Sequence, residues 1–115
     1  MQTEIRALRV PLTQGFRRQI EHRLGAAFGR FAHAVTRVRV RFADLNGPRG
    51  GVDKRCQLSV DLRPGGRVVV EAEAERVDLA LAEALARASA VLTRQLGRSG
   101  RPARLPPELV FDPAT

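Results

Sequence analysis

The sequence predicts an α+β fold: a four-stranded mixed sheet, with the element order β-α-β-β-β-α, carries two helices packed on one face. Three runs of residues between 34 and 74 alternate apolar and polar side chains with period two, as strands with one buried face do. Two further segments repeat apolar residues at helical spacing. The helical stripes and the apolar strand faces then share one core.

The first two elements are expected at residues 2–8 and 13–32. In the short first strand, Ile5 and Ala7 face inward. Thr13 suits the N-cap of the following helix because its hydroxyl accepts a hydrogen bond from a free backbone N–H of the first turn. The apolar residues of this helix recur mostly at steps of three and four and form one stripe: Phe16, Ile20, Leu24, Ala27, Phe28 and Phe31.

Three more strands follow as an antiparallel meander. The first helix is a crossover long enough to make the first two strands parallel. Residues 45–53 hold three Gly and one Pro and read as a loop, and residues 63–66 (RPGG) read as a hairpin turn. The inward residues of the three strands are Val38, Val40 and Phe42, then Cys56, Leu58, Val60 and Leu62, then Val68, Val70, Ala72 and Ala74.

A second helix begins at Asp78, which we place at or near its N-cap. Its apolar stripe consists of Leu81, Leu85, Ala88, Leu92 and Leu96. One domain is therefore expected at residues 1–98. Residues 99–115 carry four Pro and are expected to form an extended or disordered tail.

Charge is the strongest signal of function. The net charge is +8, and all 20 basic residues except Lys54 are arginine. This balance favours a polyanionic partner, most often nucleic acid. The chain has no Trp or Tyr, so base-stacking platforms are scarce and sequence-specific binding of single strands is disfavoured. Structured RNA, recognised by shape and backbone, fits better.

Seven arginines are the candidate RNA-binding residues. A ridge on the second helix is expected because three of them fall within roughly 40° of one another at about 100° per residue. Two more share a flank of the first helix, one lies at the tip of the 45–53 loop, and one follows the second helix. The alternatives are a solvated ridge that complements the helix dipole and a solvated loop. The seven are Arg87, Arg94, Arg98, Arg23, Arg30, Arg49 and Arg101.

Catalytic and metal chemistry is not expected. The only histidines are His22 and His33, and they show no metal-ligand spacing with Cys56. Cys56 shares the apolar face of its strand with Leu58 and Val60 and reads as a buried thiol. We therefore predict no enzyme activity, metal, cofactor or small-molecule substrate. No apolar run is long enough to span a membrane, and the N-terminus lacks a signal core, so a cytoplasmic location is expected.

Residues 1–98 resemble the hibernation promoting factor and ribosome-associated inhibitor family, also called sigma-54 modulation proteins, in its short form. The resemblance rests on the opening MQTEIRAL, the first helix running into AVTRVRVRF, the NGPRGGVDKRC stretch and the last helix from Asp78. Family members commonly have Tyr where this chain has Ala80. Their Lys-rich end of the last helix is matched here by arginines: Arg87, Arg94, Arg98, Arg101 and Arg104.

The resemblance implies a protein that binds the small ribosomal subunit through ribosomal RNA and blocks the messenger and transfer RNA channel under stress. The Pro-rich tail departs from the family pattern, which leaves open whether the product is inactive ribosome monomers or dimers. Two alternatives remain. One is a regulatory module of the sigma-factor type that binds a protein through the apolar tail residues Leu109, Val110 and Phe111. The other is a general binder of structured RNA.

Overall fold

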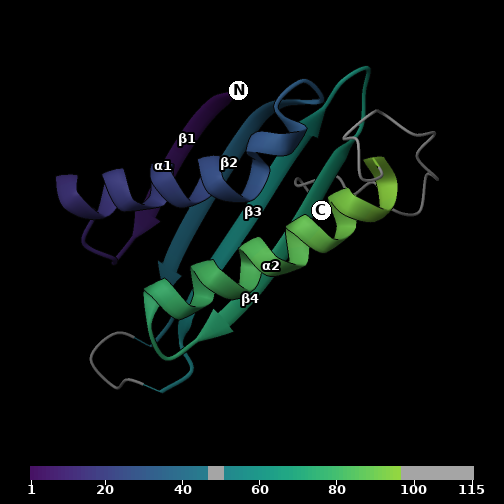
Figure 1. Cartoon of the computed structure of the whole chain (residues 1–115). Coiled ribbons are helices and arrows are strands. Elements are labelled where there is room, and N and C mark those ends of the chain that lie inside the picture. The colour runs from purple at the N-terminus through teal and green to yellow at the C-terminus, as the bar shows by residue number, and fades with distance from the viewer. Residues whose placement is uncertain (47–50, 97–115) are drawn as a thin grey trace.

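The computed structural model describes residues 1–46 and 51–96 (Figure 1). The predicted α+β fold and its element order are confirmed. The tail at residues 99–115, with Arg101, and the residues Arg49 and Arg98 lie outside the described residues. The elements are strands β1 (Gln2–Leu8), β2 (Val35–Asp44), β3 (Lys54–Leu62) and β4 (Arg67–Ala74), α-helices α1 (Gln14–Phe28) and α2 (Val77–Leu96), and the 3-10 helix η1 (Gly29–Phe31).

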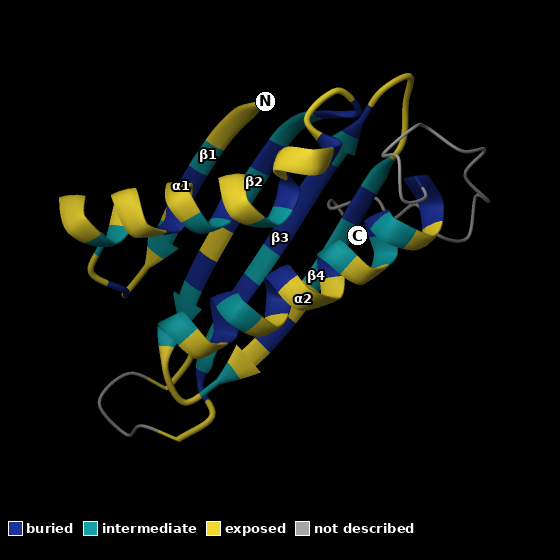
Figure 2. Ribbon diagram, viewed as in Figure 1, coloured by how far each residue is buried: buried dark blue, intermediate teal, exposed yellow. Residues whose placement is uncertain are grey.

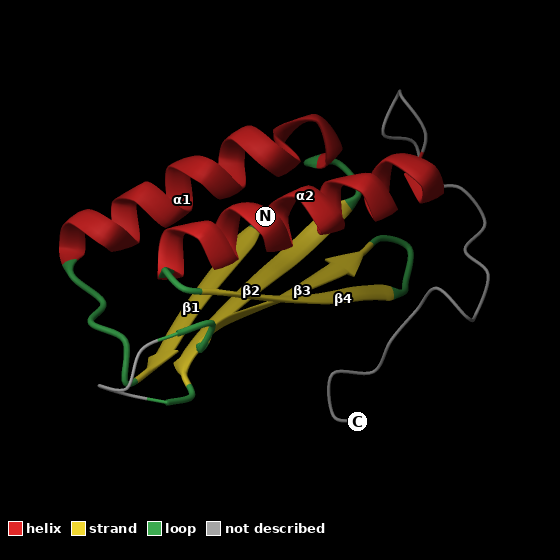
Figure 3. Cartoon of the chain, turned by 90° about the horizontal axis from the view of Figure 1, so that it is seen from below, coloured by secondary structure: helices red, strands yellow, loops and turns green. Residues whose placement is uncertain are grey.

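The four strands form one mixed sheet in the order β1-β2-β3-β4. β1 runs parallel to β2, and the other two pairs are antiparallel. The parallel pair follows from the α1 crossover, while the short connection at residues 63–66 permits only an antiparallel hairpin. Both helices lie on the same side of this sheet (Figure 3), and α2 packs on β3 and β4.

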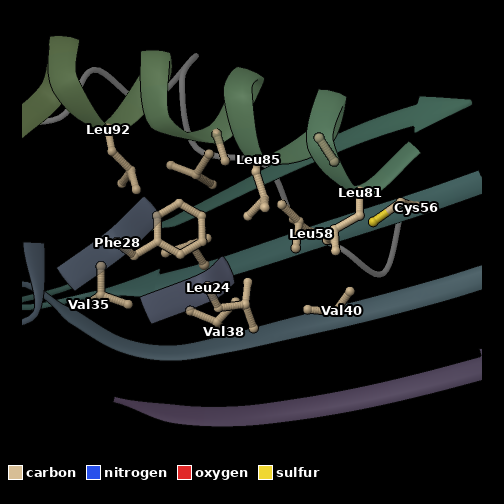
Figure 4. Close-up of a cluster of buried hydrophobic side chains, with 14 of the residues drawn as sticks. Leu24, Phe28, Val35, Val38, Val40, Cys56, Leu58, Leu81, Leu85 and Leu92 are labelled. Carbon is tan, nitrogen blue, oxygen red and sulfur yellow. The ribbon is translucent and has the colours of Figure 1, made fainter. Parts of the chain in front are cut away.

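The core fills the layer between the helices and the sheet. Figure 4 shows Leu24 and Phe28 of α1 meeting strand residues such as Val38, with Leu85 and Leu92 of α2 beside them. All of these side chains are buried. The predicted inward faces are confirmed, because the alternating residues of each strand are buried or pack against the core. The outer surfaces of both helices are exposed (Figure 2), and they are available for binding.

The ends of the helices differ slightly from the predictions. The Thr13 N-cap is confirmed, since its hydroxyl accepts a 3.1 Å hydrogen bond from the backbone N–H of Phe16. The α-helix ends at Phe28 and not at Ala32, and one turn of 3-10 helix follows. α2 begins at Val77, one residue earlier than predicted, and Asp78 lies in its first turn, near the N-cap as expected.

Candidate nucleic-acid interface

The outer face of the sheet holds most of its arginines in ion pairs. Arg55 donates from Nε and Nη2 to Oε1 of Glu73, at 3.0 and 2.7 Å. The two residues are directly opposite in the β3–β4 register. Four such residues, here termed the sheet arginines, each lie near a carboxylate: Arg37 and Arg39 near Glu4, Arg55 near Glu73, and Arg67 near Asp61. Opposite charges thus pair across neighbouring strands on this face.

These pairs shift the acid–base equilibria of their members. The hydrogen bond from Arg6 lowers the pKa of Glu4, and the charges of Arg37 and Arg39 act in the same direction. The hydrogen bond to Glu73 raises the pKa of Arg55. A phosphate that approaches a sheet arginine competes with a carboxylate already in place. The outer face is therefore a poor site for a polyanion.

Four arginines on the helices differ from the sheet arginines. Arg17, Arg18 and Arg23 project from α1, where Glu21 is the one acidic residue. Within residues 1–46 and 51–96, none of the three forms an ion pair or a side-chain hydrogen bond, and the same holds for Arg94 on α2. Arg17, Arg18, Arg23 and Arg94 are here termed the helix arginines. Their guanidinium groups keep all five N–H donors free for an anion.

Arg30 connects η1 to α2. Its Nη2 donates to Oγ1 of Thr93 on α2 at 2.6 Å, and its guanidinium carbon lies 4.5 Å from the centre of the Phe31 ring. This geometry is a cation–π contact that holds the side chain in place. Because Arg94 follows Thr93, the structure brings Arg30 and Arg94 to the same turn of α2. Part of the donor set of Arg30 is used within the protein.

Arg87 lies on the same side of α2 as Arg94, seven residues away, and on a different side from Thr93. Its Nη1 donates to the backbone carbonyl of Glu71 on β4, and its Nη2 donates to Glu83 at 3.3 Å. Arg87 thus reaches over the β4 edge, whereas Thr93 faces η1. The predicted ridge has one anchored member, Arg87, and one free member, Arg94. Its third member, Arg98, is not among the described residues.

Sequence reasoning missed Arg17 and Arg18. The signal was present, because α1 contains three arginines and a single carboxylate. Arg41 was also passed over as a site residue, although it is exposed and has no ion pair in the described part of the chain. It lies on the outer face of β2 between Arg6 and Gln57.

Other kinds of site find little support among residues 1–46 and 51–96. There, no three His, Cys, Asp or Glu side chains gather as a metal-binding group. Cys56 is buried, and burial raises the pKa of its thiol to about 12. The thiol is therefore protonated at neutral pH and a poor nucleophile. No helix in these ranges is long and apolar enough to cross a membrane.

Two solved structures share this fold. The N-terminal domain of Thermus thermophilus Protein Y superimposes with a TM-score of 0.68 at 23% sequence identity, covering 82% of this chain and 98% of that one. A ribosomal subunit interface protein from Coxiella burnetii gives a TM-score of 0.62 at 13% identity, covering 82% of this chain and 96% of that one.

At the level of sequence, the comparison with curated proteins gives no significant match. The family described as sigma 54 modulation protein / S30EA ribosomal protein matches residues 3–99, which confirms the resemblance found in the sequence. The chain belongs to the sigma 54 modulation protein / S30EA ribosomal protein family.

Proposed function

We propose that this protein is a ribosome-associated translation inhibitor. It binds the small ribosomal subunit through ribosomal RNA and blocks the messenger and transfer RNA channel under stress. The observation that carries the proposal is the division of its arginines within a chain of this family. Among residues 1–46 and 51–96, the helix arginines have no carboxylate partner, while the sheet arginines do. The proposal includes a cytoplasmic location and no catalytic step.

The physical basis is electrostatic. Each unpartnered arginine that meets a phosphate releases condensed counterions, so affinity falls steeply as salt rises. Arginine suits this role because its planar fork of donors matches the geometry of phosphate oxygens. A rigid face of helices recognises folded RNA by shape and backbone, without stacked bases. The proposed contacts are the helix arginines together with Arg30, Arg49, Arg87, Arg98 and Arg101.

The test is co-sedimentation with purified small ribosomal subunits across a salt series. Two charge-matched variants are compared with the wild type. One removes three helix arginines (Arg17→Gln, Arg23→Gln and Arg94→Gln), and the other removes three sheet arginines (Arg37→Gln, Arg55→Gln and Arg67→Gln). Both lose the same formal charge, so a difference between them reports position and not net charge.

We expect the helix variant to bind weakly with a shallower salt dependence, and the sheet variant to bind nearly as the wild type does. The wild type should also inhibit translation in a purified system. Failure to bind at low salt would overturn the proposal. Equal competition by generic duplex RNA would favour the general RNA binder, and binding insensitive to salt would favour the protein-interaction module.

A further inference from the structure

The outer face of the sheet contains a hollow of about 370 Å³ that the proposed function does not use. It lies at the end of the sheet where β1 and β2 finish. Three arginines surround it, namely Arg6, Arg41 and Arg55, and Leu8 and Ala43 contribute apolar surface. Leu8 is 63% exposed, so its side chain offers apolar surface to a ligand in the hollow.

The register explains why this hollow attracts an anion. Arg6 and Arg41 are directly opposite in the β1–β2 pair, where like charges destabilise a sheet. Arg6 is bonded to Glu4 at 3.0 Å, but Arg41 has no ion-pair partner within residues 1–46 and 51–96. On the far side, Glu71 accepts a hydrogen bond from Gln57 at 3.1 Å. The hollow thus has one free guanidinium beside apolar surface.

A nucleic acid is a poor occupant. The same face carries the carboxylates of Glu4, Asp61, Glu71 and Glu73. A row of phosphates laid across this face would be repelled by these carboxylates. A ligand whose carboxylates are separated by apolar side chains can place one carboxylate at the free arginine and apolar groups elsewhere. The chemistry of the hollow therefore fits a peptide segment that alternates in this way.

The chain contains such a segment. Residues 105–115 read LPPELVFDPAT, with two acids and no basic residue in a protein whose net charge is +8. Glu108 and Asp112 flank Leu109, Val110 and Phe111. Twelve Cα–Cα steps separate Leu96, the last residue of α2, from Glu108, and they span at most about 40 Å. That reach is close to the longest dimension of the molecule, 44 Å.

We propose that the segment Glu108–Asp112 docks intramolecularly in this hollow. One of its carboxylates pairs with Arg41, whereas Arg6 is already held by Glu4. The apolar side chains of the segment cover Leu8 and Ala43. The tail then occupies the sheet face and leaves the helix arginines on the opposite face free. The outer face becomes a binding site for the chain's own acidic end.

The test is a paramagnetic relaxation measurement on the full chain carrying Pro113→Cys with a nitroxide label. Cys56 is buried and stays protonated, so it is not labelled. We expect the amide signals of Leu8 and Ala43 to lose most of their intensity, while those of Arg18 and Glu21 on α1 keep theirs. A loss of amide signal intensity confined to α1, or a loss that is equal across the domain, would overturn the proposal.

Two variants test the pairing. Arg41→Glu should restore the Leu8 and Ala43 signals, while the matched control Arg18→Glu should leave them broadened. The tail variant Glu108→Gln/Asp112→Asn should act like Arg41→Glu without altering the folded domain. Persistent broadening in both would overturn the pairing. Broadening that disappears when labelled protein is diluted would show that a second copy supplies the tail, which would overturn the intramolecular form.

Discussion

Burial determines what Cys56 can do. The residue is fully enclosed and lies opposite Phe42 and Ala72 in the sheet register. Its thiol is kept neutral because the core offers no solvation to a thiolate. The position of Cys56 at steps of two from Leu58 and Val60, on the inward face of the strand, was enough to predict this burial from the sequence. The residue serves as a small apolar side chain and not as a reactive one.

We expect the free energy of unfolding to fall as pH rises above about 9. The folded thiol has a pKa raised from 9.0 to about 12, so the unfolded chain loses its proton first and is stabilised. The decline should approach about 1.4 kcal/mol per pH unit. The chain has no Tyr, and the pKa of Lys54 is raised by its hydrogen bond to Asp53, so the lysine contributes only at higher pH.

Urea denaturation at a series of alkaline pH values measures this dependence. The control is Cys56→Ala, which is expected to be less stable at neutral pH because it leaves a small cavity. Its stability should nevertheless be nearly independent of pH over the first unit above about pH 9. The same decline in Cys56→Ala as in the wild type would show that another group is responsible.

Ser59 shows where residue-level prediction fails. By alternation it belongs to the polar outer face, yet it is only 6% exposed. Its cross-strand neighbours are Arg39 and Val69, whose longer side chains flank it. Period-two patterning assigns a residue to a face but does not report the size of its neighbours. Burial on an outer face therefore depends on register, which is a tertiary property.

At the scale of the element, helix α1 is fixed by its cap and its stripe. Its N-terminus was predicted well because Thr13 supplies a local hydrogen bond. Its C-terminus was predicted at the wrong residue, because the step of three from Phe28 to Phe31 fits a 3-10 turn as well as an α-helix. The backbone of Phe28, at φ −114° and ψ 1°, leaves the α region there. The spacing of apolar residues alone does not distinguish an α-helix from a 3-10 helix at this point.

Removing the cap should weaken the whole domain. We expect Thr13→Ala to lower the free energy of unfolding by about 1 kcal/mol, because the backbone N–H of Phe16 loses its acceptor. Thr13→Ser keeps the hydroxyl and should retain most of the stability. Urea midpoints for the two variants give the comparison. Equal losses for Ala and Ser would mean that the methyl group matters and the hydrogen bond does not.

The contact between η1 and α2 can be measured in the same way. A double-mutant cycle of Arg30→Ala and Thr93→Val isolates the Arg30–Thr93 hydrogen bond. We expect a coupling energy of about 0.5–1 kcal/mol, because the pair is exposed to solvent. A coupling near zero would show that the bond adds nothing to stability and that Arg30 is as free to bind RNA as the helix arginines.

At the scale of the whole molecule, the fold sorts residues of one type into different roles. Arg87 and Arg94 are seven residues apart on one helix, and the sequence treats them alike. In the structure Arg87 meets Glu71, 16 residues away, while Arg94 meets no described partner. Local patterns predicted the sheet, the helices and the core. They did not predict which arginines pair, since pairing depends on the strand register and on the docking of α2.

This sorting predicts how a simple polyanion affects stability. Polyphosphate, which has no bases and no fixed shape, should bind the helix arginines of the folded protein and raise its melting temperature, because a ligand of the native state stabilises it by mass action. The rise should be much smaller in the Arg17→Gln/Arg23→Gln/Arg94→Gln variant than in Arg37→Gln/Arg55→Gln/Arg67→Gln, although both have the same net charge. Differential scanning fluorimetry at constant ionic strength measures it. Equal rises in melting temperature for the two variants would show that polyanion binding depends only on net charge. The helix arginines would then not be a preferred binding site for phosphates.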